Sequence, residues 1–247
     1  MSDFTDPITG TNAVGDPTAP EVGAADWHDG TAPADRDEAA VNKTGTTTVG
    51  IATAEGVVVA TDKRASLAGR FVSNKQVQKV EQVHPTGVMT LVGSVGGAQS
   101  FVRTLRAEAD LYDVRREEPM RIGALATLAG NFARGGPWFA INPIVAGTDE
   151  EGSHVYSVDP AGGVMKDDYT VTGSGMQLAY GTIEGNYDAE MSIEDARDLA
   201  VRAVEAASER DTGSGNGVTV ATVTDDGVEI ETFDDPVEAR VRADREN

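Results

Sequence analysis

KTGTTTVGI, residues 43–51, is the stretch at which two unlike regions of this chain meet. The residues before it are polar and turn-rich, and strand and helix patterns begin after it. A threonine hydroxyl becomes a good nucleophile beside a base, and the threonine's own α-amine can be that base once the chain is cut just before it. An α-amine has a pKa of roughly 7.7–8.0, so much of it is neutral at about pH 7–8. Because glycine adopts strained turns, Gly45 before Thr46 suits such a cut.

The same residues have a simpler interpretation. Threonine and valine favour β-strands, so Thr46–Ile51 is compatible with a strand that carries no chemistry. The catalytic interpretation therefore depends on partner residues elsewhere in the chain.

Length and composition limit the class of protein. The 247 residues are 39% hydrophobic, which is enough for one large domain or two small ones with a real core. No apolar run approaches the roughly 18 residues of a membrane span. The start, Met1–Asp6, is acidic and has no apolar signal segment, so we expect a cytoplasmic protein without a signal peptide. The absence of cysteine excludes disulfides, thiolate metal sites and cysteine nucleophiles.

The chain is strongly acidic, with a formal charge of −21 from 41 acidic and 20 basic residues. Such surfaces are used by halophiles, so the charge favours a salt-rich cytoplasm over an ordinary acidic cytosolic protein. It also makes nucleic acid a poor partner. His28, His84 and His154 have no paired spacing, so we expect no metal site.

The periodicity predicts strands in hairpins and helices in adjacent pairs after a mobile leader, residues 1–45. Residues 63–70 are predicted to be a loop. The predicted strands are Thr47–Ala52, Val57–Asp62, Phe71–Val72, Val80–Val83, Val88–Gly93, Phe139–Ala146, His154–Val158, Val218–Val223 and Val228–Phe233. The apolar faces of the predicted helices run over Ala98–Tyr112, Ile122–Phe132, Met176–Tyr187 and Ala196–Ala207, with Ser192 as a cap and a charged tail, Asp235–Asn247, that is compatible with a further helix.

This order is not the strand–helix alternation of a parallel sheet. It predicts an α+β fold in which two antiparallel sheets stack face to face and helix pairs cover both outer faces.

Several residues after the threonine stretch could carry chemistry. Asp62 ends a predicted strand and could pair with Lys79, which lies among valines and would need a partner if buried. A cation near Thr46 would stabilise its alkoxide, although Lys79 could equally lie on the surface. Gly93 lies in a strand-to-helix turn where its N–H could face an oxyanion, or where a tight turn simply requires a small residue. The glycine-rich loops at residues 172–175 and 211–217 match no phosphate or dinucleotide motif, so no cofactor is expected.

Five motifs, taken together, resemble the proteasome β subunit, most closely the archaeal form, over residues 44–240. They are TGTTTVG (44–50), ATDKRAS (60–66), KVEQV (79–83), TGSG (172–175) and RDTGSG (210–215). With the acidic excess, the resemblance indicates a haloarchaeal source.

The resemblance implies the four-layer αββα sandwich of N-terminal nucleophile hydrolases. Residues 1–45 would be a propeptide that the zymogen removes by cleaving itself between Gly45 and Thr46, and residues 46–247 would be the threonine peptidase domain. Thr46 would be the nucleophile, its amine the base, Lys79 and Asp62 the supporting charge pair, and Gly93 the oxyanion donor. The residues that would orient the amine are Ser174, Asp211 and Ser214.

The resemblance also implies a pocket for the side chain before the cut, lined by Ala65, Val77, Leu91 and Val95, and hence cleavage after hydrophobic residues. One extra residue within Leu67–Gln76 and the long acidic leader depart from the archaeal pattern.

The implied partners are other β subunits in a heptameric ring, rings of proteasome α subunits, an unfolding ATPase that acts through the α ring, and unfolded protein substrates. The helices after Gly97 and Pro119 would supply the ring-to-ring contacts. Two alternatives stay open: a structural ring subunit without activity, and an amidase of the same fold that acts on small amides.

Overall fold

The structure is a computed structural model that describes residues 45–67, 69–135 and 141–241. Residues 1–44 of the predicted leader, among them His28, lie outside the described part. The last six residues of the predicted charged tail also lie outside it.

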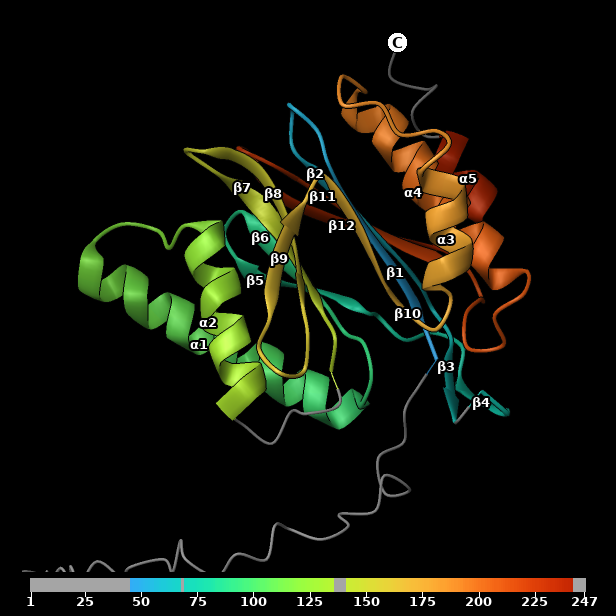
Figure 1. The fold of residues 1–247 in the computed structure, drawn as a ribbon, viewed down its shortest axis with the longest axis horizontal. Coiled ribbons are helices and arrows are strands. Elements are labelled where there is room, and N and C mark those ends of the chain that lie inside the picture. Colours follow the sequence, from blue (N-terminus) through green and yellow to red (C-terminus); the bar gives the residue numbers. More distant parts are fainter. Residues whose placement is uncertain (1–44, 68, 136–140, 242–247) are drawn as a thin grey trace, which may run out of the picture. The chain divides into compact units, whose positions relative to one another are not determined.

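Two five-stranded antiparallel sheets form the centre of the described chain (Figure 1). In spatial order the first sheet consists of β10 (Tyr169–Gly173), β1 (Thr47–Ala52), β2 (Val57–Asp62), β11 (Val218–Thr224) and β12 (Gly227–Phe233). The second consists of β5 (Val80–His84), β6 (Gly87–Thr90), β7 (Ile144–Asp149), β8 (Gly152–Val158) and β9 (Val164–Asp167). A small separate hairpin is formed by β3 (Ala65–Leu67) and β4 (Phe71–Asn74).

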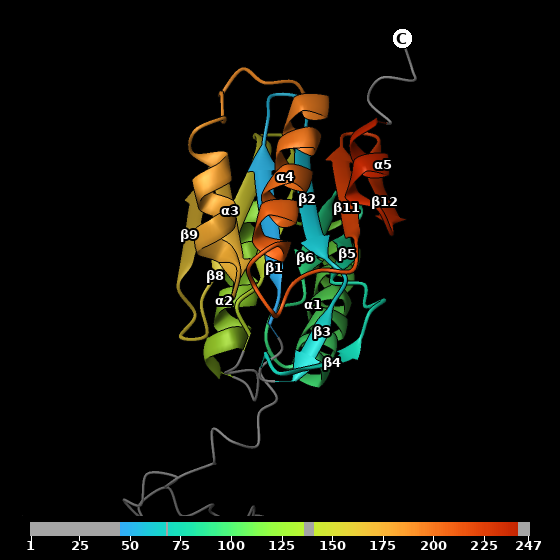
Figure 2. The same ribbon diagram turned by 90° about the vertical axis from the view of Figure 1, so that its right-hand side faces the viewer.

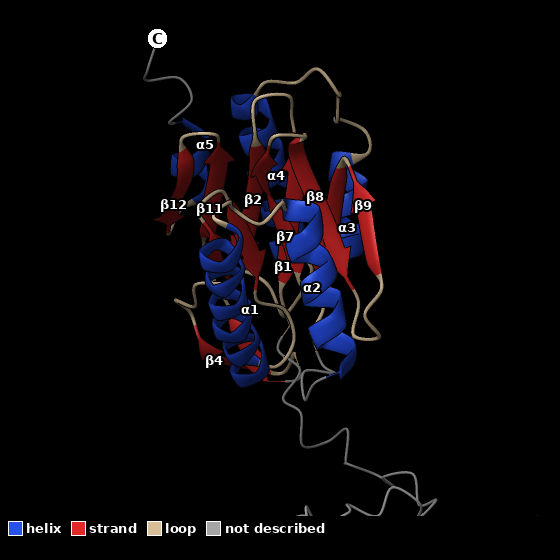
Figure 3. Cartoon of the chain, turned by 90° about the vertical axis from the view of Figure 1, so that its left-hand side faces the viewer, coloured by secondary structure: helices blue, strands red, loops and turns tan. Residues whose placement is uncertain are grey.

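Helices cover the outer face of each sheet. Figure 2 shows α3 (Met176–Ile183), α4 (Ile193–Ser208) and α5 (Pro236–Val241) on the side of the first sheet. Figure 3 shows α1 (Val95–Arg116) and α2 (Ile122–Gly135) in front of the second sheet. The predicted α+β four-layer sandwich is thus confirmed. None of the helices in the described ranges is long and apolar enough to cross a membrane.

Strand β2 shows why the central strands are apolar on both faces. Val58 and Ala60 pack into the core under α3 and α4, whereas Val57 and Val59 pack into the core between the two sheets. Successive side chains of a strand point to opposite faces, so a strand covered on both sides requires a continuous apolar run. A third core lies under α1 and α2 and contains Phe101 and Leu105, as the helical periodicity predicted.

Several predicted boundaries were wrong. The predicted loop at residues 63–70 contains β3, and the strands β9 and β10 were not predicted. The strand predicted to reach Gly93 ends at Thr90, and the one predicted from Phe139 begins at Ile144, with residues 139 and 140 outside the described part. Ser192 caps α4 as predicted, because its hydroxyl accepts the Asp195 N–H at 3.1 Å.

Candidate active site

The sheet topology brings four chain segments together at the start of β1. Strand β1 pairs antiparallel with both β2 and β10, and β11 pairs antiparallel with β2. The start of β1 therefore lies beside the ends of β2 and β10 and the start of β11. These ends carry Thr46, Asp62, Ser174 and the loop of residues 211–217, respectively. Lys79 reaches the same point from the residue before β5 of the second sheet.

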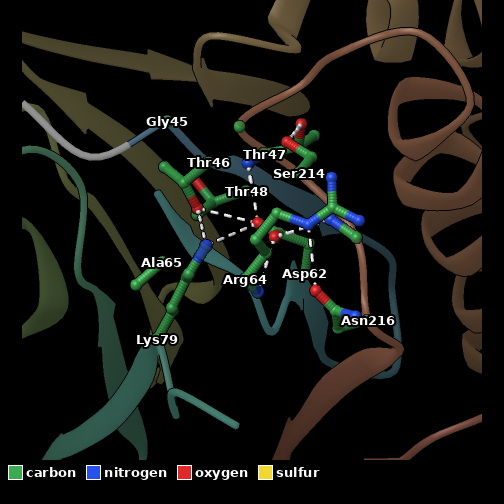
Figure 4. Close-up of polar contacts among 12 residues, drawn as sticks. Gly45, Thr46, Thr47, Thr48, Asp62, Arg64, Ala65, Lys79, Ser214 and Asn216 are labelled. Atoms are coloured by element: carbon green, nitrogen blue, oxygen red, sulfur yellow. Dashed lines mark hydrogen bonds and ion pairs between the residues drawn. The ribbon is translucent and has the colours of Figure 1, made fainter. Parts of the chain in front are cut away.

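Thr46, Asp62 and Lys79 form a closed triangle of polar contacts (Figure 4). Thr46 Oγ1 lies 2.7 Å from Lys79 Nζ and 2.9 Å from Asp62 Oδ1. Lys79 Nζ is 2.8 Å from the same Asp62 oxygen. The exposed fractions of the threonine, aspartate and lysine are 1%, 0% and 3%. Lys79 is therefore a buried, paired lysine and not a surface one.

The Asp62 carboxylate is surrounded by donors. Its Oδ1 accepts the backbone N–H of Thr47 at 3.0 Å, and its Oδ2 accepts those of Arg64 and Gly215, each at 2.9 Å. These donors satisfy the carboxylate oxygens, and Lys79 Nζ adds a charge-assisted contact to Oδ1. Burial lowers the pKa of Lys79 from its ordinary value, and the attraction of Asp62 opposes that shift. The proton of Lys79 is thus held less tightly than that of an exposed lysine.

One of the predicted orienting residues contacts the nitrogen of Thr46, and the other two are linked to it by hydrogen bonds. Thr46 N donates to Ser174 Oγ at 3.0 Å. Ser174 and Ser214 both donate to Oδ2 of Asp211, each at 2.6 Å. The structure therefore brings together Thr46, Asp62, Lys79, Ser174, Asp211 and Ser214.

The chain runs uncut through Gly45 and Thr46, so the Thr46 nitrogen here is an amide that stands in for the amine of a cut chain. Gly45 N donates to Ser66 Oγ at 3.3 Å. A Cβ at position 45 would lie 2.4 Å from the Gly213 Cα, closer than two carbons can approach. Only glycine therefore fits before Thr46 without moving the 211–217 loop.

The four residues predicted for the substrate pocket line one small cavity of about 10 Å³. Lys79, Gly93 and Ala98 complete its wall, so the cavity reaches the lysine that contacts Thr46. Gly93 has φ = +98° and forms an isolated bridge with Ile141. The positive φ explains why glycine occurs there, and the oxyanion role of Gly93 stays a prediction.

Sequence reasoning missed the contribution of Arg64. Its Nε donates to Asn216 Oδ1 at 2.9 Å and its Nη1 to the Thr212 carbonyl at 3.2 Å. A Cβ on Gly215 would lie 2.4 Å from Arg64 Nη2, so the guanidinium packs directly on that glycine. Arg64 thereby holds the loop whose Gly215 N–H binds Asp62. The available signal in the sequence was that Arg64 and Gly215 each belong to one of the motifs shared with the proteasome β subunit.

The two histidines in the described ranges, His84 and His154, have structural contacts away from Thr46. His154 Nε2 lies 2.9 Å from Asp149 Oδ1, and His84 Nδ1 accepts the Thr86 N–H at 3.3 Å. Within the described ranges no group of three or more acidic or histidine side chains could hold a metal ion.

A four-layer sandwich with a threonine at the start of a central strand, facing a buried lysine and aspartate, has the architecture of a proteasome-type N-terminal nucleophile fold. The family model described as "Proteasome subunit" matches residues 42–223, and the chain belongs to this family.

The relatives are β subunits from haloarchaea. Proteasome subunit beta 2 of Haloarcula marismortui is 72% identical over 91% of this chain and 96% of its own length. Proteasome subunit beta of Halorhabdus utahensis is 68% identical over 91% of this chain and 93% of its own. Proteasome subunit beta of Halomicrobium mukohataei is 67% identical over 95% of this chain and 98% of its own length. The predicted resemblance to haloarchaeal proteasome β subunits is therefore confirmed.

Proposed function

We propose that this proteasome β subunit is catalytic and that it is an N-terminal threonine peptidase which degrades unfolded proteins to peptides. The observation that carries the proposal is the position of Thr46 Oγ1, 2.7 Å from Lys79 Nζ and 2.9 Å from Asp62 Oδ1. A structural ring subunit needs no such buried ion pair around a threonine hydroxyl. Burying such a pair costs free energy and is weak evidence for stability alone, which supports a role in function.

In the proposed reaction, the Thr46 hydroxyl attacks a peptide carbonyl and forms an ester, which water then hydrolyses. The free Thr46 amine accepts the hydroxyl proton and returns it to the leaving amine. Lys79 stabilises the alkoxide, and the Gly93 N–H binds the carbonyl oxygen as negative charge develops on it. Ser174, held by Asp211, orients the amine.

Removal of residues 1–45 is proposed to use the same hydroxyl. Before the cut the Thr46 nitrogen is an amide and cannot act as the base, whereas Lys79 Nζ already contacts the hydroxyl. The lowered pKa of Lys79 makes its neutral form more accessible, and in that form it can accept the hydroxyl proton in this first step and then face the developing Thr46 alkoxide as an ammonium. The mature domain would be residues 46–247, with Thr46 as its N-terminus.

Substitution of Gly45 by alanine tests the processing step. The new Cβ would lie 2.4 Å from Gly213 Cα, so the bond to be cut must move relative to Thr46 Oγ1. Because a displacement of about 1 Å can slow a reaction roughly 100-fold, we expect release of the leader to slow by about that factor. Mass spectrometry over time measures the retained leader.

In the matched control, a removable tag stands in place of residues 1–45, and a separate protease cuts the chain directly before Thr46. Residue 45 is absent from that product, so its peptidase activity should be normal. Leader release at the normal rate in Gly45→Ala would contradict the proposed geometry.

The apolar lining of the cavity, Ala65, Val77, Leu91 and Val95, supports cleavage after hydrophobic residues. We expect assembled particles to cleave a fluorogenic tetrapeptide with a hydrophobic residue before the scissile bond at least about tenfold faster than an acidic counterpart. Hydrolysis of neither peptide would favour the structural subunit. Hydrolysis of small amides alone would favour the amidase.

The proposed partners are further β subunits in a heptameric ring, α-subunit rings, an unfolding ATPase acting through them, and unfolded substrates, in a salt-rich cytoplasm. Exposed apolar side chains on α1, Leu111 at 38% and Val114 at 78% exposure, support a contact surface on the helices proposed to join the two β rings.

A further inference from the structure

Thr47 lies directly after the proposed nucleophile and has no role in the reaction as described so far. The residue is fully buried, and its backbone N–H donates to Asp62 Oδ1. Its hydroxyl oxygen lies 2.7 Å from Ser214 Oγ, and Figure 4 draws the two side chains beside each other. The distance alone leaves open which hydroxyl is the donor.

The surrounding contacts determine the direction of this hydrogen bond. An ionised carboxylate only accepts, so Ser214 uses its single hydrogen on Asp211 Oδ2 at 2.6 Å. Thr47 must then donate to Ser214. On the other side, Ser174 donates to the same Asp211 oxygen at 2.6 Å and accepts from Thr46 N at 3.0 Å.

The result is one hydrogen-bond chain that converges on a single oxygen from two sides. One side runs from Thr47 through Ser214 to Asp211, and the other from Thr46 N through Ser174 to the same oxygen. Such chains polarise their members, so a donor at one end strengthens the next bond along.

Packing keeps the Thr47 hydroxyl in place. A Cβ on Gly175 would lie only 2.0 Å from Thr47 Oγ1, so the hydroxyl rests against the backbone of Gly175. This glycine follows Ser174 in the chain. Thr47 therefore contacts Ser214 directly and abuts the backbone that carries Ser174.

We infer that Thr47 is a positioning residue for the proposed threonine peptidase. Its hydroxyl fixes the Ser214 hydroxyl toward Asp211, and so fixes the acceptor that holds Ser174 against the Thr46 nitrogen. Ser214 is fully buried, so without this donor its oxygen loses a partner that water does not replace. The inference rests on the proposed function, because it is the free Thr46 amine that must be oriented.

The test compares three variants in the assembled particle, each carrying the removable tag so that every enzyme begins at Thr46. Thr47→Val keeps the shape of the side chain and removes the hydroxyl, and Thr47→Ser keeps the hydroxyl. Thr48→Val is the matched control, because Thr48 is the next residue of β1, is equally buried, and its hydroxyl bonds Thr172 Oγ1 at 2.8 Å without a contact to Asp211.

For hydrolysis of the hydrophobic tetrapeptide we expect Thr47→Val to lower kcat roughly tenfold with KM within about twofold, since orientation of the amine affects chemistry more than binding. Thr47→Ser should keep at least about half of the kcat, and Thr48→Val should resemble the unsubstituted enzyme.

Three results would overturn the inference while leaving the proposed function intact: normal kcat in Thr47→Val, an equal loss in Thr47→Ser, or an equal loss in Thr48→Val. Absence of activity in the unsubstituted particle would instead refute the proposed function, and the inference with it.

Discussion

Thr46→Ala is expected to keep its leader and to lose at least about 1,000-fold of the peptidase activity, because the substitution removes the attacking oxygen from both proposed steps. Alanine fits within the space of threonine, so the Lys79–Asp62 contact of 2.8 Å should remain and the fold should be preserved. Intact-mass spectrometry reports the leader, and a fluorogenic hydrophobic tetrapeptide reports the activity.

Thr46→Ser is the matched control for this variant. Serine keeps an oxygen within reach of Lys79 and loses only a methyl group, so this variant should mature and retain measurable turnover. The decisive experiment uses particles without any unsubstituted subunit, since a neighbour could otherwise cut the leader in trans. Maturation of Thr46→Ala at Gly45–Thr46 under those conditions would show that another group performs the cleavage.

The accuracy of the sequence predictions for the strands depended on burial and on how the glycine-rich loops were interpreted. Strand β2 was predicted because its run of valines is apolar on both faces, as a central strand requires. Strand β9 was missed because Met165, Lys166 and Asp167 are exposed on an edge strand, where no alternation is enforced. Strand β10, Tyr169–Gly173, begins with four residues of strand-favouring types and was missed because its end was interpreted as part of the glycine-rich loop at residues 172–175.

The side chains of the candidate site could be predicted from the sequence. Asp62 and Lys79 were identified by residue type and motif. Antiparallel pairing of β1 with β2 brings Asp62 to Thr46, and Lys79 reaches Thr46 from the second sheet. Backbone contributions were not predictable in this way. The Gly215 N–H reaches Asp62 only because the loop at residues 211–217 folds back on β2, whereas the Arg64 N–H reaches it locally, from two residues along the chain. Any residue type supplies such an N–H.

Lys79→Met is expected to slow both leader removal and peptide hydrolysis at least about 100-fold, because no cation then faces the Thr46 alkoxide. The substitution should also lower the free energy of unfolding by about 3–5 kcal/mol, since the fully buried Asp62 loses its cation. Peptide hydrolysis by the assembled particle and denaturant unfolding of the subunit measure the two effects separately.

Lys63→Met separates catalysis from the loss of a buried lysine. Lys63 is 2% exposed, and its Nζ lies 2.5 Å from Asp234 Oδ1. The Asp234 side chain is 81% exposed, so water can solvate its carboxylate once the lysine is gone, and the cost should be far smaller than at Asp62. Lys63→Met should therefore keep turnover within about twofold of the unsubstituted enzyme. If Lys79→Met also turned over at a near-normal rate, the cation beside Thr46 would be dispensable, and the buried pair would serve the fold alone.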